Sequence, residues 1–100
     1  MPATQLDDIL DALDQHHQRA TYGAVAAIVG SAPRTLLRGR QRDPRHSWIV
    51  NHRTGLPTGY AAEQLHPHLT TLAAILGSRE DLERWLELRR HAEVGAEHAA

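Results

Sequence analysis

Arginines are concentrated in one short stretch of this sequence. Between residues 34 and 53 the chain carries six arginines and a single acid, Asp43. The stretches on either side are acidic, so the net charge of the whole chain is only −1. Guanidinium groups bind phosphates and the edges of bases, and a localised field attracts a polyanion better than a uniformly basic composition does. The pattern therefore predicts a nucleic-acid contact.

The candidate contact residues lie on a predicted helix over residues 33–41 and on either side of it. Arg34, Arg38 and Gln41 follow an i, i+4, i+7 spacing, which places them on one side of that helix. Tyr22 is expected either to orient a phosphate through its hydroxyl or to pack beneath the preceding helix. The alternative for the arginines is a solvated helix paired with the acidic residues 1–18. The predicted DNA-binding residues are Tyr22, Arg34, Thr35, Arg38, Arg40, Gln41, Arg42 and Arg45.

The eight histidines suggest a metal site as an alternative. His66 and His68, joined by His46 or His52, would supply three imidazoles. An i, i+2 pair across a proline is not a known zinc spacing, however, and no carboxylate pattern supports it. We therefore expect no metal and no cofactor, and we assign the histidines to the surface or to helix caps.

Enzyme chemistry has little support in the sequence. Asp43, His46 and Ser47 carry the groups of a catalytic triad, but residues within five positions cannot normally align nucleophile, base and orienting carboxylate. The chain has no cysteine, so it has no thiol nucleophile and no thiolate zinc site. The turn-rich residues 54–60 lack the spacing of a phosphate-binding loop, and we expect them to form a structural wing.

Two helices are predicted before the arginine-rich stretch. A helix over residues 4–17 is indicated by apolar side chains that recur at helical spacing. These side chains are Leu6, Ile9, Leu10 and Leu13. Thr21 is expected to cap a second, almost wholly apolar helix that ends at Gly30. The arginine-rich helix would then begin near Ser31 and Pro33, which gives a helix-turn-helix connection.

The remaining elements are shorter and less regular. Residues 47–50 read as a strand, and residues 69–76 as a second strand or a helical turn, with a strand preferred. Trp48 is expected in the core more than as a base-stacking platform, and Trp85 in the core. A last helix is predicted over residues 79–91, with residues 93–100 frayed. The expected fold is a mainly α domain with a small β-wing, a winged-helix-like helix-turn-helix domain formed by residues 1–100.

Parts of the chain resemble a known family. Residues 21–30, 34–44, 48–50 and 55–60 are similar to the C-terminal DNA-binding domain of O6-alkylguanine-DNA alkyltransferases, and more similar to the alkyltransferase-like proteins that lack the reactive cysteine. The resemblance covers about residues 5–60. It implies that Arg34 inserts into the duplex where a nucleotide is flipped out, and that Tyr22 helps to rotate the phosphate of that nucleotide. Pro44 matches the proline that ends the recognition helix.

Two departures from the family pattern limit what carries over. Asp43 stands where the family has an asparagine hinge, and residues 45–48 replace the reactive Pro-Cys-His-Arg motif after a shorter loop. The resemblance thus implies a non-enzymatic protein that binds double-stranded DNA and recognises alkylated or flipped bases in repair. The alternative is a protein-interaction module on the same scaffold, with its acidic first helix and its last helix as contact faces. A metal- or small-molecule-binding regulator is the second alternative.

The composition also restricts the location of the protein. No apolar run approaches the length of about 20 residues that a membrane span requires, and the acidic N-terminal residues differ from a signal peptide. The absence of cysteine fits a reducing compartment. We therefore expect a cytoplasmic protein without membrane contact.

Overall fold

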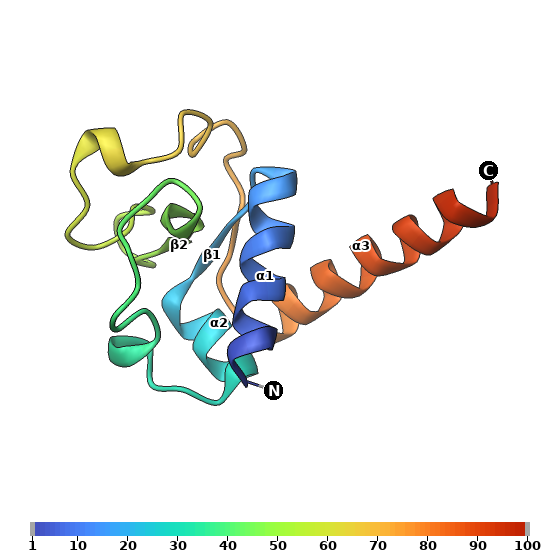
Figure 1. Ribbon diagram of the computed structural model, residues 1–100, viewed down its shortest axis with the longest axis horizontal. Coiled ribbons are helices and arrows are strands. Elements are labelled where there is room, and N and C mark those ends of the chain that lie inside the picture. The colour runs from blue at the N-terminus through green and yellow to red at the C-terminus, as the bar shows by residue number, and fades with distance from the viewer. Residues whose placement is uncertain (1, 100) are drawn as a thin grey trace.

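The domain has a mixed α/β architecture of three helices and a small parallel sheet (Figure 1). The computed structural model describes residues 2–99 and the side chains of residues 5–89. The helices and strands are α1 (Pro2–His16), β1 (Arg19–Thr21), α2 (Tyr22–Val29), β2 (Ile49–Val50), β3 (Ile75–Leu76) and α3 (Arg79–Ala99). Three short 3-10 turns lie between them at Pro33–Thr35, His46–Trp48 and Ala62–Gln64.

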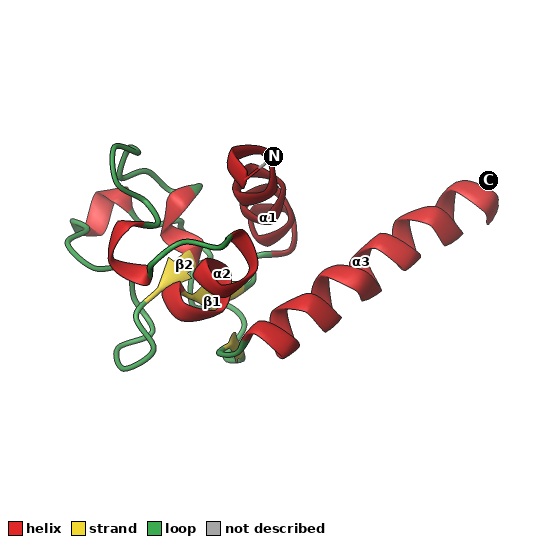
Figure 2. Ribbon diagram, turned by 90° about the horizontal axis from the view of Figure 1, so that it is seen from below, coloured by secondary structure: helices red, strands yellow, loops and turns green. Residues whose placement is uncertain are grey.

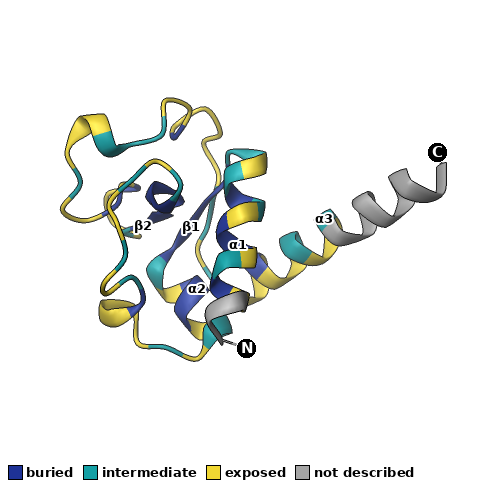
Figure 3. Cartoon of the chain, in the orientation of Figure 1, coloured by how far each residue is buried: buried dark blue, intermediate teal, exposed yellow. Residues whose placement is uncertain are grey.

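The predicted apolar face of α1 forms one side of the core (Figure 3). Leu6, Ile9, Leu10 and Leu13 are all buried. Trp48 is fully buried among them, and its indole Nε1 donates a hydrogen bond of 2.8 Å to Asp14 Oδ1 on α1. The partner satisfies the one polar group of the indole, which an apolar core would otherwise leave unpaired. Trp48 is thus a core residue, as predicted.

The start and end of α2 follow the predicted capping signals. Thr21 has an extended backbone, and its hydroxyl accepts a hydrogen bond from the amide of Ala24. Gly30 takes a left-handed conformation with φ of 76°, and its amide donates to the carbonyl of Ala26. Both predictions are confirmed, so the position and length of α2 are determined by its local sequence.

The strands form a parallel sheet in the order β2-β1-β3. Ala20 pairs with Ile49 on one side and with Leu76 on the other, so β1 is central. The sequence predicts a small β-wing and no strand at residues 19–21, and β1 is therefore an unpredicted element. Figure 2 shows most of the loops between residues 30 and 74 gathered on the side of the sheet opposite α3.

The predicted helix over residues 33–41 is wrong. The chain forms a 3-10 turn at Pro33–Thr35, and the amides of Arg38 and Arg40 bond to carbonyls three residues back. Gly39 then takes a φ of 79°, which ends any helical path. Only Leu36 and Leu37 offer apolar surface, and Ser31 places its hydroxyl on the carbonyl of Ala32 instead of capping a helix. A segment this short has too little packing to nucleate an α-helix.

Other boundaries differ by a few residues from those predicted. The strand expected at residues 47–50 is a 3-10 turn followed by β2, and the strand expected at residues 69–76 is confined to β3. α3 is assigned as far as Ala99, beyond the predicted end at residue 91. The predicted fraying of residues 93–100 concerns residues whose side chains lie outside the described range. No described helix combines the length and apolar character needed to cross a bilayer.

Candidate nucleic-acid interface

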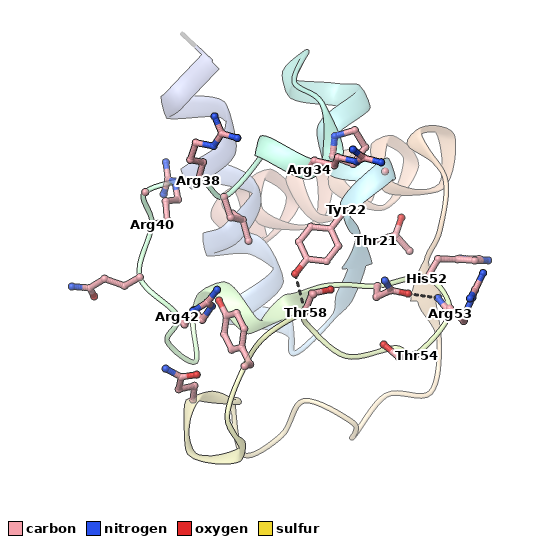
Figure 4. Close-up of a pocket in the computed structure, with 18 of the residues that line it drawn as sticks. Thr21, Tyr22, Arg34, Arg38, Arg40, Arg42, His52, Arg53, Thr54 and Thr58 are labelled. Atoms are coloured by element: carbon pink, nitrogen blue, oxygen red, sulfur yellow. Dashed lines mark hydrogen bonds between the residues drawn. The ribbon is translucent and has the colours of Figure 1, made fainter.

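An open cleft of about 1300 Å³ lies on the loop side of the domain (Figure 4). Its floor is the start of α2, one wall is the arginine-rich segment 33–42, and the other is formed by residues 51–54 and 58–64. The lining includes five arginines and one histidine, and no aspartate or glutamate. The cationic residues of the cleft are Arg34, Arg38, Arg40, Arg42, His52 and Arg53.

Four of these arginines are available to a ligand. Arg34, Arg38, Arg42 and Arg53 are exposed, and none has an ion pair or a side-chain hydrogen bond within the described part of the chain. In Figure 4 the labelled arginines are arranged around the ring of Tyr22. Because like charges converge there and no carboxylate lines the cleft, the cleft presents a positive potential to solvent although the whole chain is slightly acidic.

The other two arginines of the stretch are held by α1. Arg40 Nη1 lies 2.7 Å from Asp7 Oδ1, and Arg45 Nη2 lies 2.8 Å from Asp11 Oδ1. The hydrogen bond from Arg40 and the positive charge of Arg45 hold the pKa of Asp7 below its usual range. The sequence offers the alternative that the arginines pair with the acidic residues 1–18. Arg40 and Arg45 do so, and the other four arginines of the stretch stay free.

Two tyrosines lie in the cleft. The Tyr22 hydroxyl oxygen accepts a hydrogen bond of 3.0 Å from the amide of Thr58, and the ring packs against the core. The packing interpretation of Tyr22 is therefore confirmed, and the phosphate contact stays a prediction. The hydroxyl proton of Tyr22 is still available to an acceptor in the cleft. Burial, with a smaller contribution from Tyr22, raises the pKa of Tyr60 to about 12, so this phenol stays neutral.

Most of the predicted contact residues meet in this cleft. Six of the eight line it, namely Tyr22, Arg34, Arg38, Arg40, Gln41 and Arg42. Arg45 lies outside the cleft, where its guanidinium pairs with Asp11 of α1. Thr35 is exposed outside the cleft, and its hydroxyl donates to the carbonyl of Ala32. Turns bring Arg34, Arg38 and Gln41 to one side of the chain in place of the predicted helix face.

Sequence reasoning missed the second wall. Arg53 belongs to the arginine stretch but is not among the predicted contacts. The same is true of the other residues of this wall, which are His52, Thr54, Thr58 and Tyr60. The turn at Arg53 depends on local bonds, since its amide donates to Asn51 Oδ1 and Gly55 has a φ of 73°. The sequence therefore predicts a turn at this position. It does not predict that this loop faces the arginine segment across a cleft, because only the folded chain brings the two together.

The alternative sites are not assembled. Within the described residues, no group of three or more histidine, aspartate or glutamate side chains is placed to hold a metal ion. His46 Nδ1 lies 2.6 Å from Asp43 Oδ1, but Ser47 Oγ donates to the carbonyl of Pro44 and accepts from the amide of His66. Hydrogen bonds from His46 outweigh the effect of burial and lower the pKa of Asp43. The His46–Asp43 pair thus fixes the backbone where the arginine segment meets Trp48.

Comparison of the chain with protein-family models, with curated proteins and with solved structures finds no match. The likeness to alkyltransferase-like proteins therefore depends on the residues given above.

Proposed function

We propose that this chain is a DNA-binding domain that takes the phosphate backbone of DNA into its cationic cleft. One observation carries the proposal: four unpaired arginines surround a cleft that no carboxylate lines. Phosphate contacts of this kind supply most of the affinity of proteins for DNA without regard to sequence. The amide groups at the N-terminus of α2, which opens into the cleft, add a smaller favourable field for an anion.

The resemblance gives this proposal its finer form. Arg34 and Tyr22, which match the inserted arginine and the phosphate-rotating tyrosine, both line the cleft. We assign to α2 and the turns after Gly30 the DNA-contacting role that a helix-turn-helix pair has in the family that the chain resembles, although the second helix is replaced here by turns. With no cysteine to accept an alkyl group, the role we propose is recognition of damaged DNA in the cytoplasm, without catalysis.

A protein-interaction module is the second candidate. It is favoured by an exposed apolar side chain on α3, Leu88, whose exposed fraction is 54%. Asp7 and Asp11 already bind arginines within the molecule, which leaves less of the acidic α1 face free for a partner. Under this reading the four free arginines would only be solvated.

Fluorescence anisotropy with a labelled duplex separates the two candidates. We expect binding whose affinity falls steeply between low and moderate salt, because each neutralised phosphate adds about 0.9 to the salt slope. The double variant Arg34→Ala, Arg38→Ala should lower that slope by about 1.8 and weaken binding. Arg79→Ala with Arg84→Ala removes the same charge outside the cleft and should change little. Equal effects of the two variants, or affinity independent of salt, would contradict the proposal.

A gain of charge provides a second test. Asp7→Asn removes the carboxylate that neutralises Arg40, which lies in the cleft lining. The variant should bind the duplex more tightly and raise the salt slope by up to about 0.9. Asp8→Asn is the matched control, because Asp8 is exposed on α1 and contacts no described arginine. Repeating both titrations with an O6-alkylguanine in the duplex tests the damage preference that the resemblance implies.

A further inference from the structure

Three imidazoles and one indole form a cluster beside the core, which we call the imidazole stack: His17, Trp48, His66 and His68. The His17 ring lies between Trp48 and His68, with centroid separations of 5.5 and 5.0 Å and interplanar angles of 10° and 16°. His66 is tilted against all three rings, 4.7 Å from Trp48 and 5.0 Å from His17. His17 is the first residue after α1. Its φ of 53° is a left-handed conformation that turns the backbone away from the helix.

His66 makes several contacts, and one of them needs its neutral ring. Its Nδ1 accepts a hydrogen bond of 3.0 Å from the amide of His68, so the ring proton is on Nε2. That Nε2 lies 3.9 Å from Asp14 Oδ1, which also accepts from Trp48. The backbone amide of His66 donates to Ser47 Oγ. A second proton on the ring would occupy Nδ1 and break the bond from His68.

The charges around His66 oppose its protonation on balance. The groups that face it are His17 and Asp14 from α1, Ser47 and Trp48 from the turn before β2, and His68 from its own loop. Burial, followed by the neighbouring His17 and then His68, lowers the pKa of His66, and Asp14 only partly offsets this. Protonated imidazoles this close together would also repel one another.

The stack fixes one end of a cleft wall. Leu65 is the C-cap residue of the 3-10 turn Ala62–Gln64 and precedes His66 in the chain, and Gln64, Tyr60 and Thr58 line the cleft. Leu69, at the other end of the loop, is buried in the core. The segment between β2 and β3 is tied to β1 at both ends by Arg19 and to α2 by Tyr22. Its middle, residues 65–69, is held by the contact of His66 and His68 with His17 and Trp48.

We propose that the imidazole stack is an acid-sensitive latch, which holds residues 65–69 on Trp48 when neutral and releases them, with the cleft wall 58–64, when His66 is protonated. Because the folded chain favours the neutral ring, the latch contributes its full stability above the unfolded pKa of about 6.5. This contribution is lost as the pH falls from there toward the lower pKa of folded His66. The effect on DNA binding rests on the proposed function, and the latch itself does not.

NMR titration of the labelled full chain from pH 7.5 to 5.0 tests the latch directly. We expect the Cε1–H signal of His66 to titrate with a midpoint below 6.5. The amide signals of residues 65–69 and 58–64 should shift at the same midpoint. A His66 midpoint at or above 6.5, or amides in these segments that do not follow it, would overturn the proposal.

A matched pair of variants assigns the transition to His66. In His66→Asn the side-chain oxygen can accept the amide two residues on, as Nδ1 does, but it does not titrate in this range. The acid transition of residues 58–69 should therefore disappear in this variant. In His52→Asn, which removes an imidazole on the other side of the cleft, the transition should remain. Its persistence in His66→Asn, or its loss in His52→Asn, would contradict the latch.

Duplex binding at pH 7.5 and 5.5 connects the latch to the cleft. We expect wild type and His66→Asn to bind equally at pH 7.5, and His66→Asn to bind at least threefold more tightly at pH 5.5. Equal binding at both values would overturn the link between latch and cleft. If no protein binds DNA at any pH, the proposed function fails while the NMR titration still decides the latch.

Discussion

Arg19 is a buried cation that joins three parts of the chain. It lies in β1 with an exposed fraction of 8%, and its guanidinium donates to the carbonyls of Gly55 and Leu72, each at 2.9 Å. No described carboxylate pairs with it and its buried Nε has no hydrogen-bond partner, so the two carbonyls compensate only in part for its loss of hydration. Arg19 therefore links the central strand to the loop after β2 and to the segment before β3.

Replacing Arg19 by methionine should destabilise the domain. The substitution keeps much of the side-chain length but leaves two carbonyls without their charged donor, at a cost on the order of 3 kcal/mol in the free energy of unfolding. Urea unfolding followed by tryptophan fluorescence measures the change. Arg84→Met, an exposed position on α3, should change the free energy by no more than about 0.5 kcal/mol. A loss of similar size in both variants would show that the buried bonds of Arg19 add little.

At the residue scale, the sequence identifies the arginine stretch but not the partners of its members. Asp7 and Asp11 lie more than thirty positions before Arg40 and Arg45, and only the packing of α1 brings them together. Arg19 lies before the stretch with no other arginine near it in the sequence, and a single arginine carries no sign of burial. Which arginines are free was therefore not predictable, because that depends on long-range contacts.

At the scale of elements, prediction succeeded where local signals determine the structure. The α1 face follows from apolar spacing, and the ends of α2 follow from Thr21 and Gly30. The helix over residues 33–41 failed because its arginines lack the packing that stabilises a short helix. The parallel sheet was missed because strands of two or three residues carry almost no periodic pattern, and their pairing joins segments far apart in the chain.

Gly23, within α2, and Gly30, which ends it, should respond to alanine in opposite ways. Neither Gly23 nor Gly30 has an atom within 4 Å of the position that a Cβ would occupy, so an alanine meets no clash at either position. Gly23 lies within the helix, and Gly23→Ala should raise the free energy of unfolding by about 0.5–1 kcal/mol. Gly30 has a φ of 76°, and Gly30→Ala should lower it by about 1 kcal/mol. Thermal unfolding measures both; a shift of the same sign would contradict the assigned end of α2.

At the scale of the whole molecule, charge is separated rather than balanced. The isoelectric point is about 6.7, yet four unpaired arginines line the cleft and four aspartates lie on α1. The approach of a polyanion depends on the field near the cleft, since charges more than about 8–10 Å away are screened at physiological salt. Above the isoelectric point, the negative net charge therefore predicts weak binding of DNA, whereas the local charge of the cleft predicts that binding persists.

Binding at pH 8 distinguishes these two predictions. Arginines keep their charge at this pH, and His52 is the single histidine among the residues that line the cleft. Burial lowers the pKa of His66, so its ring stays neutral at both pH 7 and pH 8 and the cleft wall should not move. We expect the dissociation constant for a duplex at fixed ionic strength to change by less than about threefold between these values, although the net charge becomes more negative. A tenfold loss of affinity would show that the overall charge governs association, and that the cleft is not the binding site.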